Sequence, residues 1–180
     1  MPVPSKGGNT IGILICGLNG CGKSTVGNAL AKALGLHFID IEHLYFSRNS
    51  ASDPYRHPNS RQEVERLLLE EIRAQGDFVL AAVKGDYGEA IIPLYRCVVL
   101  LDVPRALRLQ RVRHRSLQKF GSRMLPGGDL HEQEEAFFRL VEARRDDYVE
   151  QWVQTLTCPV IRVDGTQPVE NIVACILHQL

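Results

Sequence analysis

Five short runs rich in apolar residues recur along the chain, each bounded by glycine or by polar residues. Runs of this length are typical of strands inside a sheet that is covered on both faces. They occupy residues 11–16, 36–41, 78–83, 97–101 and 160–163. The pattern therefore predicts five buried strands.

Helical periodicity fills much of the chain between these runs. Apolar residues recur every three or four positions, which is typical of a helix with one buried face. The expected helices cover residues 24–34, 61–74, a segment that begins at Pro104, about 132–155, and 169–180. Strands that alternate with helices predict a parallel sheet between two helical layers. We therefore expect an α/β fold of three layers (α/β/α) with five parallel strands.

Composition agrees with one folded domain over residues 1–180. Hydrophobic residues make up 44% of the 180-residue chain, and 21 basic residues balance 21 acidic ones. Zero net charge argues against binding to nucleic acid or to an anionic membrane through bulk charge. No apolar run approaches the ~18 residues of a membrane span, and the first ten residues lack a signal-peptide core. We expect a cytoplasmic monomer or homodimer.

A glycine-rich motif follows the first predicted strand and opens the first predicted helix. It matches GxxxxGK[ST] at every position. The glycines let successive main-chain N–H groups point inward, and the helix N-terminus adds positive potential, so the loop suits a polyphosphate. The lysine reaches the terminal phosphates and the serine hydroxyl binds Mg²⁺. The motif predicts ATP binding by Gly17, Leu18, Asn19, Gly20, Cys21, Gly22, Lys23, Ser24 and Thr25.

The motif, the chain length and the order of elements resemble the small P-loop kinases, such as adenylate kinase and shikimate kinase. The chain lacks the NKxD element with which switch GTPases read guanine. The resemblance implies a P-loop NTPase fold with a short lid, ATP and Mg²⁺ as cofactors, and transfer of a phosphoryl group to a small acceptor. A glycine-rich turn without a ligand is the alternative.

A basic helix follows Asp102-Val103-Pro104. Residues three and four apart share a helix face, so we expect its arginines to approach an anion, although a solvated face is the alternative. The pattern resembles the RxxxR of adenylate kinases, which implies that Arg111 lies against adenine and Arg115 against phosphates. The turn at Gly165, in the sequence VDGT, resembles the turn that places backbone against adenine. The arginines of this helix include Arg108, Arg111, Arg113 and Arg115.

Residues 116–131, which contain three glycines, resemble the lid that closes on phosphates in these kinases. Two arginines in the next predicted helix fit competing resemblances. Arg145 begins a sequence similar to the RxDD of adenylate kinases, and Arg144 with Tyr148 resembles the RxxxY of shikimate kinases. Each arginine is a candidate for stabilising the transferred charge, or pairs only with a nearby carboxylate.

The acceptor side is expected within residues 41–75 and after the third strand. Asp40 and Glu42 close the second strand, where shikimate kinases have a DxD; alternate strand residues share a face, so both can point into a cleft. The resemblance implies that Asp40 binds Mg²⁺ or activates the acceptor hydroxyl and that Glu42 binds the acceptor. Asp40 can instead be a helix N-cap.

Further acceptor candidates follow the third strand and lie in the polar segment 47–60. Lys84 and Asp86 stand where adenylate kinases have DGxPR, which is absent here. Arg48, Arg56 and Arg61 provide basic side chains that can replace the missing arginine, or simply face water.

We therefore expect an ATP- and Mg²⁺-dependent kinase whose acceptor is a nucleoside, a nucleoside monophosphate or a hydroxylated metabolite. Two other functions remain open. One is a regulatory module that binds ATP without transferring phosphate, and the other is a kinase acting on nucleic-acid ends.

Overall fold

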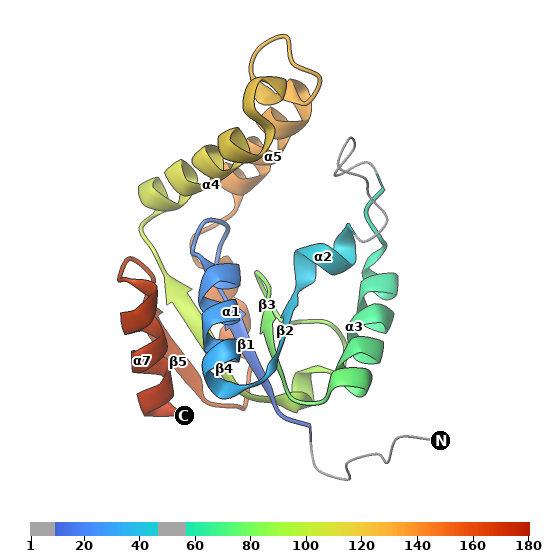
Figure 1. Ribbon diagram of the computed structural model, residues 1–180, viewed down its shortest axis with the longest axis vertical. Coiled ribbons are helices and arrows are strands. Elements are labelled where there is room, and N and C mark those ends of the chain that lie inside the picture. Colours follow the sequence, from blue (N-terminus) through green and yellow to red (C-terminus); the bar gives the residue numbers. More distant parts are fainter. Residues whose placement is uncertain (1–9, 47–56) are drawn as a thin grey trace.

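The computed structural model describes residues 10–46 and 57–180. Its centre is a sheet of five parallel strands in the order β2-β3-β1-β4-β5, with helices on both faces (Figure 1). The expected three-layer fold is confirmed. The strands are β1 (Gly12–Cys16), β2 (His37–Asp40), β3 (Phe78–Ala81), β4 (Tyr95–Asp102) and β5 (Val160–Asp164).

The helices follow the predicted order with two differences. A short helix, α2, follows β2 without a loop, and the single helix expected over 132–155 is two helices. The helices are α1 (Lys23–Leu34), α2 (Ile41–Tyr45), α3 (Arg61–Gln75), α4 (Arg105–Phe120), α5 (His131–Ala143), α6 (Tyr148–Val153) and α7 (Val169–Gln179), with 3₁₀ turns η1 (Ile92–Leu94) and η2 (Gly121–Met124).

Tertiary contacts explain why the long helix is broken. Arg105 on α4 donates hydrogen bonds to the carbonyl oxygens of Glu142, in the last turn of α5, and of Arg144, the residue that follows the helix. Arg144 itself is extended, with φ −70° and ψ 125°. A helix end whose carbonyls are satisfied by another element can stop there without a glycine cap. Hydrophobic periodicity gives no information on such a distant contact, so the sequence predicted a continuous helix.

The core lies on both sides of the sheet, and a second cluster lies apart from it. Leu14 and Ile15 of β1 are fully buried. The second cluster joins α4 to α5 through Val112, Phe138 and Val141. These two helices lie side by side and project beyond the carboxyl edge of the sheet (Figure 1). The segment 116–131 is the outer end of this helical arm.

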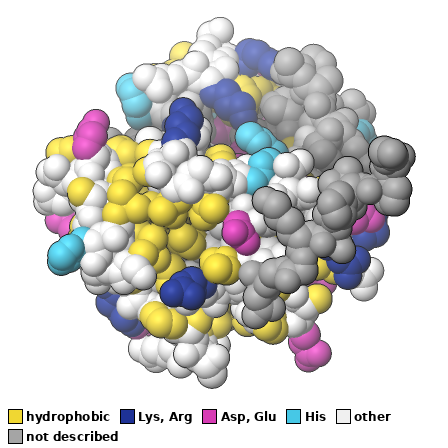
Figure 2. All heavy atoms as spheres, turned by 60° about the horizontal axis from the view of Figure 1, so that its bottom comes forward, with side chains coloured by type: hydrophobic (Ala, Val, Ile, Leu, Met, Phe, Trp, Pro, Cys, Tyr) yellow, Lys and Arg dark blue, Asp and Glu magenta, His cyan; other side chains and the backbone are white. Residues whose placement is uncertain are grey.

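Charged side chains of both signs are interspersed on the face shown in Figure 2, where apolar side chains gather near the centre. Within residues 10–46 and 57–180, no helix combines the length and the apolarity needed to cross a membrane.

Candidate active site

A cavity of about 600 Å³ is lined by residues at the carboxyl edge of the sheet and by residues of α2, α4 and α5. In Figure 1, α2 lies on one side of this edge and the arm of α4 and α5 on the other. Parallel sheets bind ligands at this edge because the loops after each strand converge there. The cavity brings together eleven of the candidate residues, which come from six separate segments. They are Asn19, Gly20, Lys23, Ser24, Asp40, Glu42, Arg61, Lys84, Asp86, Arg115 and Arg144.

Two glycines in the phosphate loop have positions that a larger residue would disturb. Gly22 is the N-cap of α1 and has a φ of 88°, in the left-handed region. Gly20 has a φ of 87°, and a Cβ there would overlap the backbone of Arg108 on α4. The loop therefore adopts a compact turn that L side chains rarely tolerate, and it is packed against α4.

The side chains of Leu18 and Cys21 point into the core, with 7% and 3% of their surface exposed. Burial raises the pKa of the Cys21 thiol, so the group is a neutral packing residue. Gly17, Gly22 and Thr25 do not line the cavity. If these five residues contact a nucleotide, they do so through the backbone of the loop or outside the cavity described here.

Lys23 folds back over the loop. Its ammonium donates a hydrogen bond of 3.1 Å to the carbonyl oxygen of Leu18. The pKa of Lys23 is lowered to about 8, chiefly by burial and also by the positive charge of Arg115, whereas Cys21 and Asp40 oppose the shift. The lysine thus lies beside the loop in an environment that disfavours its charge.

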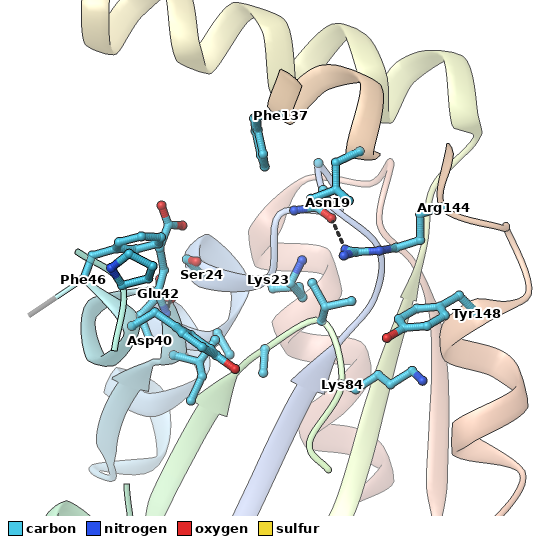
Figure 3. A pocket seen from close by; sticks show the side chains of 18 of the residues that line it. Asn19, Lys23, Ser24, Asp40, Glu42, Phe46, Lys84, Phe137, Arg144 and Tyr148 are labelled. Carbon is cyan, nitrogen blue, oxygen red and sulfur yellow. Dashed lines mark hydrogen bonds between the residues drawn. The ribbon is translucent and has the colours of Figure 1, made fainter. Parts of the chain in front are cut away.

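Asp40 is the N-cap of α2. Its Oδ1 accepts a hydrogen bond of 3.0 Å from the backbone N–H of Glu42. The expectation that both acids share a strand face is therefore wrong, because β2 ends at Asp40 and Glu42 lies in the first turn of α2. Both nevertheless line the cavity, and Figure 3 shows them on the same side of it as Phe46. The turn from β2 into α2, rather than alternation along a strand, brings both carboxylates to the cavity.

The arginines of α4 divide into two groups. Arg108 is 4% exposed and donates 2.7 Å to the carboxylate of Asp146, and Arg113 donates 3.0 Å to Glu142. The expectation that the whole basic face approaches an anion is wrong for these two, which bind the chain's own carboxylates. Arg115 lines the cavity and has no hydrogen bond or ion pair within the described part of the chain.

Arg111 lies between the phosphate loop and the turn after β5. It donates to the carbonyl oxygens of Gly20 at 3.5 Å and of Gly165 at 3.2 Å. A Cβ at Gly165 would lie 2.7 Å from Val103 and 3.3 Å from the carbonyl oxygen of Cys21. Arg111 and Gly165 thus lie beside the loop, outside the lining of the cavity.

Arg144 and Arg145 point in different directions. Arg144 lines the cavity, donates 2.6 Å to Oδ1 of Asn19 and lies 5.3 Å from the ring centroid of Tyr148 (Figure 3). Arg145 is 74% exposed, pairs with Asp147 at 2.7 Å and does not line the cavity. Of the two competing alignments, the geometry favours the one that uses Arg144.

The residues after β3 complete the floor of the cavity. The Lys84 ammonium lies 3.6 Å from the ring centroid of Tyr148, so both Lys84 and Arg144 contact this ring. Asp86 lines the cavity with its Oδ2 3.6 Å from Arg61, which also binds Glu65 at 3.2 Å. Arg48 and Arg56 lie outside the described residues.

Comparisons with known proteins agree with this geometry. Residues 13–122 match AAA_18, described as an AAA domain, so the chain belongs to that family. A shikimate kinase of Geobacter sulfurreducens is 31% identical over 152 residues, which cover 83% of this chain and 82% of that enzyme. The chain belongs to the shikimate-kinase-like group of small P-loop kinases.

Two further proteins resemble the kinase over nearly its whole length. YqaC, an uncharacterized protein of Bacillus subtilis, is 28% identical over 176 residues and covers 93% of the kinase and 96% of its own chain. A gluconokinase structure from Sinorhizobium meliloti has a TM-score of 0.59 at 20% identity, covering 94% of the kinase and 91% of its own chain. The latter likeness concerns the fold.

Several cavity residues of the kinase were not found by sequence reasoning. They are mostly aromatic or lie on α2 and α5, where the sequence offers only an amphipathic pattern. Phe137 and Phe138 illustrate the difficulty, because Phe138 packs between α4 and α5 while Phe137 faces the cavity. The residues missed are Tyr45, Phe46, Pro58, Tyr87, Gln133, Glu134, Phe137 and Leu140.

The donor set of the kinase suits Mg²⁺ rather than a metal bound by protein alone. Among the described residues, no three His, Cys, Asp or Glu side chains gather as ligands for a metal. Mg²⁺ keeps several waters and commonly takes one or two protein oxygens together with substrate phosphates. Ser24 and Asp40 both line the cavity that Lys23 faces, and they are oxygen donors of this kind.

Proposed function

We propose that the kinase transfers the γ-phosphoryl group of ATP to a hydroxyl of a small acceptor. The observation that carries this proposal is the shared cavity: Lys23 and Ser24 of the phosphate loop and the carboxylates of Asp40 and Glu42 line the same space of about 600 Å³. A donor site and a polar site that face each other in this way suit a direct transfer.

The phosphate end of the cavity is built to offset negative charge. Phosphoryl transfer places charge on the equatorial oxygens, and catalysis consists mostly of positioning and charge stabilisation. We assign Lys23 to the terminal phosphates, and Arg115 and Arg144 to the transferred group. Arginine suits this role because its charge is permanent and its donors form a planar fork. Arg145, exposed and paired with Asp147, is left out of the proposed site.

The nucleoside end of ATP is assigned to the surface formed by Gly165 and the phosphate loop. Arg111 contacts both segments through the carbonyl oxygens of Gly20 and Gly165. The guanidinium therefore fixes the distance between the loop and the turn after β5. Its role is to position the adenine site, with any stacking on the base as an additional contact.

Asp40 is the proposed acid–base residue. One oxygen of its carboxylate is occupied by the N–H of Glu42, while the other has no hydrogen-bond partner among the described residues. That oxygen can accept the proton of an acceptor hydroxyl as the hydroxyl oxygen bonds to the γ-phosphorus. The bond between that phosphorus and ADP breaks in the same step, and ADP leaves. Ser24 would bind Mg²⁺ directly, with Asp40 in the outer shell of the metal, and the metal would neutralise charge on the phosphates when bound.

The acceptor is a nucleoside, a nucleoside monophosphate or a hydroxylated metabolite. The shikimate kinases and the gluconokinase named among the relatives act on hydroxylated acceptors by name, which supports the last class. Glu42, Lys84 and Asp86 are the proposed acceptor contacts, together with the aromatic side chains on α2.

A coupled assay of ADP release, run across these acceptor classes, tests the proposal. We expect at least one acceptor to raise ADP release above the rate with ATP alone. We expect Lys23→Ala to abolish turnover and weaken ATP binding while the protein remains folded. Tight ATP binding with no acceptor-dependent turnover would favour the regulatory module, and salt-dependent phosphorylation of an oligonucleotide end would favour the nucleic-acid kinase.

A further inference from the structure

Glu134 on α5 is a buried carboxylate without a complete set of partners. Its surface is 2% exposed, and its Oε2 has no hydrogen-bond partner among the described residues. Buried carboxylates are normally paired or hydrogen-bonded, because loss of hydration strongly disfavours the charge. This oxygen is therefore open to a hydrogen-bond donor that the described residues do not supply.

Glu134 lines the same cavity as the phosphate loop. Its neighbours on the cavity face of α5 are Gln133, Phe137 and Leu140, which follow the three- and four-residue spacing of one helix face. Tyr45 of α2 and Phe46, which follows that helix, line the other side of the cavity. Figure 3 shows Phe137 above the space between Phe46 and Arg144. We call the part of the cavity lined by α2, by the segment after β3 and by this face of α5 the acceptor half. Glu134 belongs to it and lies opposite α2.

The charges of this half disfavour an anionic acceptor. Glu42, Asp86 and Glu134 bring three carboxylates to it. Arg61 is already engaged by Asp86 and Glu65. Lys23, Arg144 and Arg115 lie at the phosphate loop, where the charge of Arg115 acts on Lys23. Lys84 is the one cation among the proposed acceptor contacts, and its ammonium lies against the ring of Tyr148. A carboxylate or phosphate on the acceptor would face repulsion here, whereas an N–H or O–H group would satisfy the carboxylate of Glu134.

We propose that Glu134 is an acceptor-binding residue and that it selects an uncharged acceptor with N–H or O–H donors beside a flat apolar face. This inference rests on the proposed kinase function and narrows its acceptor. The aromatic side chains of Phe46 and Phe137 provide contact surface for the apolar face. Glu134 and the neighbouring amide of Gln133 provide the polar recognition.

The experiment compares uncharged with anionic acceptors. ADP release is measured with ATP and Mg²⁺ and with adenosine, thymidine, shikimate or gluconate as acceptor. We expect a nucleoside to have a kcat/KM at least about tenfold above the two acids, since a lost hydrogen bond or an uncompensated charge has an effect of this order. A preference for shikimate or gluconate overturns the inference and leaves the kinase function standing. No turnover with any acceptor overturns both.

Variants of Glu134 provide the second arm. With the best acceptor, Glu134→Gln should raise the acceptor KM about tenfold, with little change in kcat or in the KM for ATP. Its Tm should stay close to that of the wild type, because glutamine keeps the size and shape of the buried side chain. Glu132→Gln, an exposed neighbour on α5, is the matched control and should behave as the wild type.

The combination of readouts separates recognition from structure. An unchanged acceptor KM in Glu134→Gln, or a loss of activity that only follows a loss of Tm, overturns the inference. If Glu134→Gln does not fold, Glu134→Asp provides the test, because it keeps the charge and withdraws the carboxylate by one methylene. It should raise the acceptor KM, and an unchanged KM would contradict the assignment.

Discussion

Arg144 donates a hydrogen bond of 2.6 Å from its guanidinium to Oδ1 of Asn19. The bond joins the connection between α5 and α6 to the phosphate loop, over 125 residues of sequence. Asn19 can lose this bond without leaving a buried charge, whereas the guanidinium requires another acceptor. Phosphate oxygens are that acceptor in our proposal, so Asn19 holds Arg144 in place until ATP binds.

Replacing Arg144 by alanine should lower kcat by about a hundredfold, the usual effect of removing one donor that stabilises transition-state charge. The KM for ATP should change much less. Steady-state kinetics with the best acceptor provide the measurement. Arg145→Ala is the control, because its side chain is exposed and outside the cavity, and it should retain wild-type kcat. Equal losses in both variants would contradict the choice of Arg144.

Replacing Asn19, which accepts the hydrogen bond from Arg144, should lower kcat less than replacing Arg144 itself. Asn19→Ala leaves Arg144 free to reach the phosphates, so we expect kcat to fall by no more than about fivefold. The ratio of the kcat loss in Asn19→Ala to the kcat loss in Arg144→Ala distinguishes a residue that positions Arg144 from one that contacts phosphate. A loss in Asn19→Ala as large as in Arg144→Ala would show that Asn19 itself binds phosphate.

ATP affinity should depend on pH through Lys23. In the free kinase burial lowers the pKa of this lysine to about 8 from an ordinary 10.5, and bound polyphosphate must raise it because opposite charge favours the ammonium. Below pH 8 the lysine is charged in both states and affinity is constant. Above pH 8 binding requires proton uptake, so affinity should fall by up to about tenfold per pH unit.

Calorimetry in buffers of different ionisation enthalpy measures this uptake directly. Near pH 8.5 the wild type should take up a fraction of a proton as ATP binds. Lys23→Arg is the control, because arginine stays protonated throughout this range, and its affinity for ATP should not fall above pH 8.

The same lowered pKa means that the folded state disfavours the charged lysine below pH 8. The free energy of unfolding should therefore gain from this group as pH rises from 8 to 10.5.

The ion pair between the buried Arg108 and the exposed Asp146 should contribute to stability rather than to catalysis. Arg108 also donates 3.0 Å to the carbonyl oxygen of Val103, so it fixes the start of α4 to the connection after α5. Asp146→Ala should lower the free energy of unfolding by about 1–2 kcal/mol, since a buried guanidinium loses a charged partner. Urea denaturation measures the loss. Asp147→Ala removes an exposed pair and should have a smaller effect.

The sequence predicted a parallel sheet of five strands, the order of strands and helices along the chain, and the phosphate loop. These features depend on short-range patterns. A buried strand needs an apolar run, and an anion nest needs glycines at fixed spacing. The break between α5 and α6 could not be predicted, because it depends on Arg105, which lies about 40 residues earlier and binds the carbonyls at the helix end.

The site was predictable where a motif required particular residues, and not where shape alone selects them. The spacing of Lys23 and Ser24 was sufficient, and Asp40 was found although the strand geometry expected for Glu42 was wrong. Glu134 had no signal at all. It lies in a helix with several other acidic residues, and only its burial beside the cavity distinguishes it from Glu132 and Glu135.

The contact between Arg111 and Gly165 should determine how tightly ATP is held. A Cβ at Gly165 would lie 2.7 Å from Val103 and 3.3 Å from the carbonyl oxygen of Cys21 in the phosphate loop. Gly165→Ala should therefore push the turn after β5 away from the loop and weaken the bond from Arg111. We expect the KM for ATP to rise about fivefold to tenfold, with the KM for the acceptor unchanged, because the acceptor half is formed by other segments. Arg111→Gln, which removes the guanidinium without adding volume, should raise the KM for ATP in the same way. A rise in acceptor KM in either variant, or an unchanged KM for ATP in both, would contradict a nucleotide-positioning role for this turn.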